Sequence, residues 1–233
     1  IDILMIISII VPVYNEEKTI LASLTKLNKL EFKEFKKEII VVDDGSKDKT
    51  NEHLSANKNL FTKIITKVKN EGKGSAVKIG IENSTGSHIV FHDSDLEYDP
   101  QDLLKFEEVF LNFNADAVIG SRFNYDKYTR SHNILNKIGN FFITTFFNIL
   151  YNTTFTDIYA CYFAFRRDLL SAKNLKIMGF GQHAEIICSV IKKGSKFYEV
   201  PINYNGRSIS DGKKIRFYDF FSVVLVILFN RFK

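Results

Sequence analysis

Four acidic side chains alternate along the short segment FHDSDLEYDP. Asp93, Asp95, Glu97 and Asp99 occupy every second position directly after an apolar run. Because successive side chains of an extended chain point to opposite sides, this spacing places the carboxylates on one side. Carboxylates gathered in this way need a compensating positive charge, or their pKa values rise. A divalent cation, Mg²⁺ or Mn²⁺, would supply that charge through hard oxygen ligands. A solvated turn is the alternative that this segment alone leaves open.

Two further polar clusters follow other apolar runs. VYNEE ends the run at residues 6–13, and DDGS ends the run at residues 38–43. In open α/β sheets, ligands bind beyond the carboxyl ends of the parallel strands. We therefore expect the three clusters to meet in one crevice, and this convergence favours a ligand site over a solvated turn. The EGKG segment is not a P-loop, so it either opens a helix or contacts a phosphate.

The apolar pattern alternates between strand and helix. We expect strands at residues 6–13, 38–43, 61–68, 89–92 and 117–120, and helices at residues 18–30, 48–53, 73–83 and 101–112. Asp99 and Pro100 are expected to begin the last of these helices, with Asp102 in its first turn. Repeated β-α alternation with β-branched strands predicts an α/β fold, in which helices flank a mostly parallel central sheet.

Bulk composition is that of an ordinary globular chain with one large core. The 233 residues are 45% apolar and 25% charged, with a formal net charge of +5. That charge suits an anionic partner such as a phosphate, a nucleotide or an acidic membrane surface. The basic residues are scattered and form no nucleic-acid-binding motif, so no nucleic acid is expected as a partner. Cys161 and Cys188 have no disulfide or metal spacing, which favours free core thiols and a cytoplasmic protein.

Two apolar stretches approach the length of a membrane span without reaching it. They are IGNFFITTFFNILY at 138–151 and FYDFFSVVLVILF at 217–229. A spanning helix needs about 20 apolar residues, so we expect core helices or helices that lie in a membrane interface. We expect the chain to divide into a main domain at 1–216 and a C-terminal apolar helix at 217–233. A peripheral protein at the cytoplasmic face of a membrane, or one anchored by a partner subunit, is the corresponding expectation.

Seven segments together carry a family resemblance. They are IIVPVYNEEKTI, EIIVVDDGSKDKT, NEGKGSAVKIGI, HDSDLEYDPQDL, VIGSRF, TDIYACYFAFRRDLL and EVPINYNGRSISDGKKI. In order and spacing they resemble the motifs of family-2 inverting glycosyltransferases with the GT-A fold, a Rossmann-like single domain. The closest branch resembles the dolichyl- or polyprenyl-phosphate mannosyl- and glucosyltransferases. The resemblance covers about residues 6–220, nearly the whole chain.

The resemblance implies a metal-dependent hexosyltransferase that uses Mg²⁺ or Mn²⁺. Such an enzyme would move a hexose from a UDP- or GDP-linked donor to a polyprenyl or dolichyl phosphate lipid. A transferase that acts on a sugar hydroxyl in polysaccharide or surface-glycan synthesis is the alternative within enzymes. A non-catalytic nucleotide-sugar-binding subunit is the alternative outside them.

The resemblance also implies roles for individual residues. The residues expected to hold the nucleoside are Pro12, Tyr14, Glu16, Val42, Asp43 and Asp44. Those expected to hold the donor diphosphate are Lys73, Asp93, Ser94, Asp95, Arg122, Arg207, Lys213 and Lys214, with the metal on Asp93, Asp95 and Glu97. For Lys73, contact with the base is the alternative to contact with a phosphate. Relatives often carry Gln at the position of Glu97.

Catalysis is expected to depend on Asp95, Arg122 and Asp157, with Asp157 taking the proton from a hydroxyl acceptor. Glu185, in GFGQHAE, is expected to contact or orient the sugar. An acceptor phosphate would meet Arg122, Arg130 and Lys137. Relatives often have Arg at the last position, and Lys keeps the charge without the bidentate fork.

Overall fold

A computed structural model describes residues 5–123, 134–179, 181–206 and 219–233, with the backbone alone at 135, 136 and 219. The strands are β1 (Ile6–Val13), β2 (Lys36–Asp43), β3 (Lys63–Thr66), β4 (His88–Phe91), β5 (Ala117–Ser121), β6 (Phe163–Arg166) and β7 (Phe197–Pro201). The α-helices are α1 (Ile20–Asn28), α2 (Thr50–Ala56), α3 (Lys73–Glu82), α4 (Leu103–Phe113), α5 (Ile134–Tyr151), α6 (Gln182–Ile191) and α7 (Asp219–Phe232).

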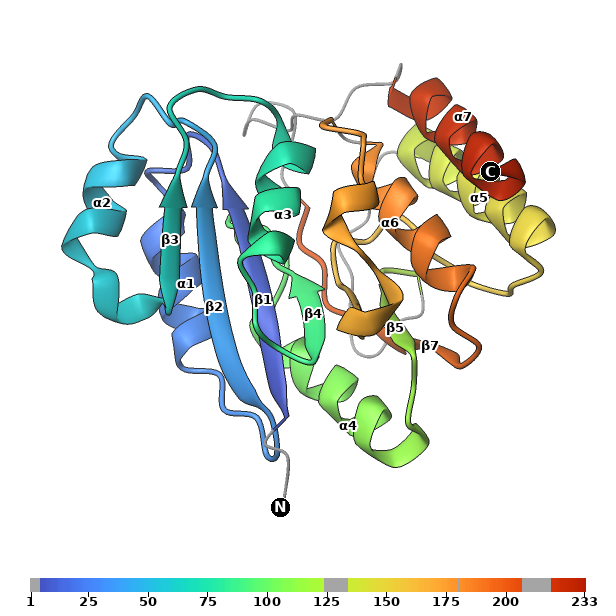
Figure 1. Ribbon diagram of the computed structural model, residues 1–233, viewed down its shortest axis with the longest axis horizontal. Coiled ribbons are helices and arrows are strands. Elements are labelled where there is room, and N and C mark those ends of the chain that lie inside the picture. The colour runs from blue at the N-terminus through green and yellow to red at the C-terminus, as the bar shows by residue number, and fades with distance from the viewer. Residues whose placement is uncertain (1–4, 124–133, 180, 207–218) are drawn as a thin grey trace.

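The strands form one sheet in the order β3-β2-β1-β4-β6-β5-β7. Every neighbouring pair is parallel except the two that involve β6, which runs antiparallel to both β4 and β5. Helices cover the sheet on both faces, with α3 on one side and α1 on the other (Figure 1). This arrangement confirms the predicted α/β fold with a mostly parallel central sheet.

The observed elements differ from the predicted ones mainly at their ends. β3 is limited to four residues of the predicted strand at 61–68, and α2 begins at Thr50 rather than at residue 48. β6 and β7 were not among the predicted strands, because their apolar runs are short. Asp99 accepts a hydrogen bond from the backbone N–H of Gln101 at 3.1 Å and caps the turn that Pro100 begins, as predicted.

Alternate side chains of β2 pack in two different buried clusters. Ile40 and Val42 pack with Ala76 of α3 in a small cluster, whereas Ile39 and Val41 face the main core. The period of two is the pleat of the strand, and both faces are apolar because both are covered by helices. The side chain of Val42 therefore lies beneath α3 and is fully buried.

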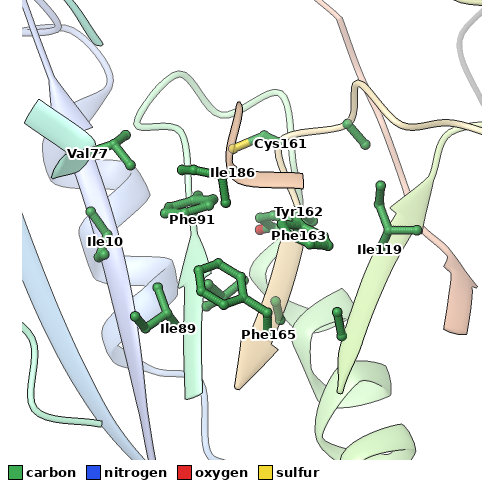
Figure 2. Packing of buried hydrophobic residues seen from close by; sticks show 14 of the residues in the cluster. Ile10, Val77, Ile89, Phe91, Ile119, Cys161, Tyr162, Phe163, Phe165 and Ile186 are labelled. Carbon is green, nitrogen blue, oxygen red and sulfur yellow. The ribbon is translucent and has the colours of Figure 1, made fainter. Parts of the chain in front are cut away.

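The main core includes the layer between β4, β6 and α6. Phe91, Phe165 and Ile186 belong to the same buried cluster (Figure 2). Cys161 and Cys188 are both buried and free, as predicted. The core therefore packs α6 against β4, the strand that directly precedes the acidic segment.

The C-terminal helix packs against the rest of the domain. α7 lies beside α5 (Figure 1), and its Val223 and Ile227 are buried in the main cluster. The hydroxyl of Tyr151 donates to the carbonyl of Ile227 at 3.3 Å, and the guanidinium of Arg231 lies 5.5 Å from the centre of the Tyr151 ring. The predicted boundary at residue 216 lies outside the described residues. Across the described ranges, no helix combines the length and apolar character that crossing a bilayer requires.

Candidate active site

The loops after β1 and β2 are joined to each other. Asn15 adopts a left-handed conformation (φ 52°), and its backbone N–H donates to the hydroxyl of Ser46 at 3.0 Å. Its side-chain oxygen accepts from the N–H of Lys47 at 2.8 Å. The N–H of Glu16 donates to the Thr50 hydroxyl at 2.9 Å. The first two polar clusters therefore meet at one edge of the sheet, as the topology of parallel strands requires.

The residues predicted to hold the nucleoside differ in what they present. Pro12 and Val42 are register partners in adjacent strands, and the buried side chain of Val42 leaves only its backbone for a ligand. Asp43 is 1% exposed and accepts from both the N–H (2.9 Å) and the hydroxyl (2.6 Å) of Ser46. Tyr14 is half-buried, while Glu16 is 9% exposed.

Asp44 organises the next loop. Asp44 is 2% exposed, and its carboxylate pairs with the ammonium of Lys67 and accepts from the backbone N–H of Gly72 at 2.8 Å and of Glu71 at 3.1 Å. A buried carboxylate is stable when it is paired and hydrogen-bonded in this way. In this structure Asp44 therefore shapes the turn that begins α3, and its predicted contact with the nucleoside stays a prediction.

The EGKG turn connects three parts of the chain. Gly72 has a φ of 98°, which a side chain would strain. The N–H of Gly74 donates to the carbonyl of Met178 at 2.7 Å, and a Cβ at Gly74 would lie 2.6 Å from that same oxygen. Between these glycines, Lys73 sends its ammonium to the Asp93 carboxylate at 2.6 Å. The glycines allow close approach, and the lysine reaches the acidic segment.

The ammonium of Lys73 compensates part of the negative charge of the acidic segment after β4. Burial opposes the charge on both partners, yet their mutual attraction raises the pKa of Lys73 and lowers that of Asp93. Asp95 accepts from the backbone N–H of Glu97 at 3.1 Å, across a turn in which Leu96 has a φ of 64°. Such a φ is uncommon for a bulky residue. Ser94, between the two aspartates, is 4% exposed.

Arg122 and Asp157 form a buried bidentate pair. The Nε of Arg122 lies 2.7 Å from one carboxylate oxygen of Asp157 and its Nη2 lies 2.9 Å from the other, while Asn140 donates to the same carboxylate at 3.1 Å. Asp157 is 0% exposed and the Arg122 side chain is 17% exposed. Burial would lower the pKa of Arg122, but the Asp157 carboxylate raises it well above its ordinary value. The guanidinium is therefore a fixed cation whose orientation is set by Asp157.

Tyr204, which is not among the predicted site residues, links the acidic segment to Arg122. Its hydroxyl donates to a carboxylate oxygen of Glu97 at 2.7 Å, and its ring centre lies 5.1 Å from the Arg122 guanidinium carbon. A backbone bridge to Tyr98 holds this segment in place. Only its position in NYNG, beside a predicted ligand loop, could have drawn attention to Tyr204. Tyr204 therefore links Glu97, a predicted metal ligand, to Arg122, a predicted phosphate ligand.

Lys137 and Glu185, two further predicted site residues, differ in what they contact. The ammonium of Lys137, on α5, lies 6.0 Å from the centre of the Phe123 ring, next to Arg122. Glu185 accepts backbone N–H groups of Lys176 at 3.1 Å and of Ile177 at 3.0 Å. It thereby orders the segment that contacts the EGKG turn, which favours an orienting role over direct contact with the sugar. The remaining predicted cations, Arg130, Arg207, Lys213 and Lys214, lie outside the described residues.

Comparison with known proteins identifies the family. Residues 8–172 match the family described as Glycosyl transferase family 2. An uncharacterized protein of Methanocaldococcus jannaschii is 33% identical over 86% of this chain and 90% of its own length. A dolichol-phosphate mannosyltransferase of Pyrococcus furiosus is 28% identical over 90% of this chain, which spans 59% of that longer protein.

A solved structure supports the same conclusion about the fold. It is that of glucosyl-3-phosphoglycerate synthase from Mycobacterium tuberculosis in complex with Mn²⁺, UDP and glucosyl-3-phosphoglycerate. The TM-score is 0.71 at 19% identity, over 97% of this chain and 80% of that one. This likeness confirms the predicted GT-A fold. By its sequence match, the chain belongs to glycosyltransferase family 2.

Proposed function

We propose that the protein is an inverting hexosyltransferase that moves a hexose from a UDP- or GDP-linked donor to a polyprenyl or dolichyl phosphate. One observation carries the proposal: Tyr204 contacts both Glu97 of the acidic segment and the guanidinium of Arg122. Carboxylates suited to a metal–diphosphate thus lie beside a fixed cation suited to a second phosphate. The name of the Pyrococcus relative points to the same class of acceptor.

The donor side suits Mg²⁺ or Mn²⁺. Asp93, Asp95 and Glu97 offer hard oxygen ligands. Asp93 already pairs with one cation, the ammonium of Lys73, which supports its role as a carboxylate that binds a positive charge. In the described ranges, no three acidic, histidine or cysteine side chains already form a metal cluster. Mg²⁺ needs only one or two protein carboxylates when substrate phosphates supply other ligands. The bound ion would neutralise charge on the departing diphosphate.

On the acceptor side, Arg122 is the proposed phosphate ligand. A guanidinium held in a fixed plane binds phosphate oxygens with geometric specificity. A lipid phosphate is already an anion at neutral pH, so its attack on the sugar needs little help from a base. Asp157 then acts by positioning Arg122, since its carboxylate accepts from Arg122 and Asn140. Lys137 and Arg130 remain proposed as further phosphate contacts.

An apolar surface on α5 and α7 would bring the enzyme to the lipid. The large side chains that both helices expose are Ile134, Ile138, Phe141, Phe142, Ile149, Phe221, Leu225, Phe229 and Phe232. The two helices lie side by side (Figure 1). Apolar residues with basic neighbours such as Lys137 and Arg231 are typical of helices that lie in a membrane interface. We therefore propose peripheral binding at the cytoplasmic face of a membrane.

The first experiment is calorimetric titration of the purified protein with UDP and GDP, each with and without Mn²⁺. We expect one nucleotide to bind tightly and to lose affinity when the metal is absent. The matching nucleotide-hexose is then incubated with polyprenyl phosphate in detergent, and the product is analysed for an inverted anomeric bond. Transfer only to sugar hydroxyls would favour the polysaccharide alternative. Absence of nucleotide binding by the folded protein would contradict the proposal.

A matched variant tests the metal ligand. Asp95→Asn keeps the size of the side chain and removes its charge, so metal-dependent nucleotide binding should fall. Its measured transfer rate with Mg²⁺ should fall as well. An unchanged rate would remove Asp95 from the proposed metal site.

A further inference from the structure

Asp102 stands where an aspartate usually caps a helix, but its side chain is used elsewhere. It directly precedes α4, and its carboxylate makes no capping hydrogen bond to that helix, which the structure describes in full. Aspartate is favoured at such a position because its oxygen can accept from the first free N–H groups of the helix. Asp102 is 2% exposed, and a buried carboxylate needs hydrogen-bond donors or a counter-ion. Its main donors come from a residue 101 positions further along the chain.

That residue is Asn203, just after β7. Its backbone N–H donates to one carboxylate oxygen of Asp102 at 2.7 Å, and its side-chain amide donates to the other at 3.1 Å. The ammonium of Lys105 lies 3.0 Å from the same carboxylate and also donates to the carbonyl of Pro201 at 2.8 Å. Asp102 and Lys105 therefore hold the β7 extension, residues 202–205, against the beginning of α4.

The other end of the β7 extension lies in the candidate active site. The N–H of Asn205 donates to the carbonyl of Glu97 at 2.9 Å. The hydroxyl of Tyr204 donates to the Glu97 carboxylate at 2.7 Å, and its ring centre lies 5.1 Å from the guanidinium carbon of Arg122. The residue that Asp102 holds is the immediate chain neighbour of Tyr204. Because adjacent Cα atoms are only about 3.8 Å apart, that contact sets the position of Tyr204.

Glu107 on the same helix does similar work away from the site. It is also 2% exposed, and its carboxylate accepts the backbone N–H groups of Lys33, Glu34 and Phe35 at distances between 2.8 and 3.0 Å. Those residues directly precede β2, so they lie at the amino-terminal end of the parallel strands. α4 thus carries two buried carboxylates that each hold a distant segment, and the segment held by Asp102 is the one that enters the site.

We propose that Asp102 is a positioning residue that acts through Tyr204. By holding the β7 extension against α4, it places the tyrosine hydroxyl on the Glu97 carboxylate and the ring beside the Arg122 guanidinium. The inference rests on the proposed function, in which Glu97 is a ligand of the metal that binds the donor diphosphate. Asp102 itself contacts neither the metal nor a substrate.

The test compares Asp102→Asn with Glu107→Gln in calorimetric titrations of UDP and GDP with Mn²⁺. Each variant keeps the size of a buried side chain and removes its charge, so both should be less stable in urea than the native protein. Asp102→Asn should also weaken binding of the preferred nucleotide about tenfold, the effect of one hydrogen bond to a charged group. Glu107→Gln should leave that Kd unchanged.

A second background shows whether Asp102 acts through Tyr204. In Tyr204→Ala the side chain to be positioned is gone, so adding Asp102→Asn should cause no further loss of affinity. The swap Asp102→Asn/Asn203→Asp restores one carboxylate and one amide to the contact, and it should recover part of the affinity lost in Asp102→Asn. A residue that only stabilised the fold would give neither result.

Hydrogen exchange follows the β7 extension directly. In Asp102→Asn, a peptide that contains residues 202–205 should exchange faster, whereas a peptide from β1 should keep its native rate. Asn203→Ala removes the side-chain amide and leaves the backbone donor in place, so it should change exchange and affinity in the same direction by less. This milder variant supplies the comparison with Glu107→Gln if Asp102→Asn does not fold.

The outcomes separate this proposal from the one on which it rests. An unchanged Kd in Asp102→Asn, or equal losses in Asp102→Asn and Glu107→Gln, would overturn the positioning role and leave the proposed function standing. A further loss on the Tyr204→Ala background would overturn it as well, because Asp102 would then act independently of the tyrosine. If the native protein binds neither nucleotide with Mn²⁺, the proposed function fails, and the role of Asp102 fails with it.

Discussion

Lys73 and Asp93 form an ion pair across 2.6 Å, between the turn before α3 and the segment after β4. Their side chains are 37% and 21% exposed, so the pair is partly accessible to solvent rather than enclosed in the core. The first acid of the proposed metal site thus carries an internal counter-ion. A divalent ion that binds Asp93 has to displace this ammonium or share the carboxylate with it.

Replacing Lys73 with methionine should tighten the binding of Mn²⁺ alone. The change removes a positive charge that competes for Asp93, and for a partly exposed pair we expect a gain of roughly three- to tenfold. Binding of the nucleotide diphosphate should weaken, because Lys73 is a proposed phosphate ligand. Titrations with Mn²⁺ alone and with Mn²⁺ plus nucleotide measure the two effects separately.

Lys63→Met is the control for the loss of one charge. Lys63 is the first residue of β3 and so lies at the amino-terminal end of the parallel strands, whereas the proposed site lies beyond their carboxyl ends. Its ammonium is 2.8 Å from the side-chain oxygen of Asn83. This variant should leave both affinities unchanged. If Lys73→Met weakens binding of Mn²⁺ alone, the lysine supports the metal site rather than competing for it.

Asp157→Asn should destabilise the fold. Removing one member of a buried ion pair leaves the other charge uncompensated, and the expected loss is about 3–5 kcal/mol in the free energy of unfolding. Urea unfolding measures that loss. The double variant Asp157→Asn/Arg122→Met should be more stable than Asp157→Asn alone, since the unpaired guanidinium is gone. A single variant with native stability but no transfer would instead support Asp157 as the proton acceptor.

Tyr204→Phe should weaken the binding of Mn²⁺ with nucleotide less than Tyr204→Ala does. The phenylalanine loses the hydroxyl that donates to Glu97 but keeps an aromatic ring beside the Arg122 guanidinium. A hydrogen bond to a charged group is worth about 1.5–3 kcal/mol, and a cation–π contact adds about 0.5–2 kcal/mol. Titration of both variants gives the two contributions. Equal affinities in the native protein and in Tyr204→Ala would exclude Tyr204 from the site.

The free energy of unfolding should fall as the pH is lowered from about 6.5 to about 4. Burial lowers the pKa of His92 from 6.5 to about 4, and the same change is found for His88 and His183. In this pH window the unfolded chain binds protons that the folded chain does not, so the stability present above pH 6.5 is lost on acidification. Each histidine contributes up to about 1.4 kcal/mol per pH unit.

A variant of His92 isolates one of these contributions. The ring nitrogens of His92 lie 3.0 Å from the hydroxyl of Ser23 and 2.9 Å from that of Tyr162, so the neutral form is held on both sides. His92→Gln should be less stable near pH 7 and should show a smaller slope between pH 4 and 6.5. Urea unfolding at several pH values measures the slope. An unchanged slope would contradict a neutral His92 in the folded state.

Much of the site could be predicted from the sequence, because strand ends obey local rules. Apolar runs that end in VYNEE, DDGS and DSD mark three carboxyl ends of strands, and parallel pairing then brings them to one edge. The role of Asp99 as a cap was predictable for the same reason, since a cap depends on its immediate neighbours. The net charge of +5 and the acidic segment likewise follow from composition and spacing alone.

Only the tertiary structure decided which of these charges meet. Arg122 and Asp157 are 35 residues apart and Glu97 and Tyr204 are 107 residues apart, so no local pattern relates them. The sequence did not distinguish an aspartate that shapes a turn, as Asp44 does, from one that pairs with a partly exposed lysine, as Asp93 does. Burial and distance set the strength of each such interaction, and both are properties of the packed chain. Sequence by itself determined the fold class and the chemical groups at the edge of the sheet, whereas folding determined their partners.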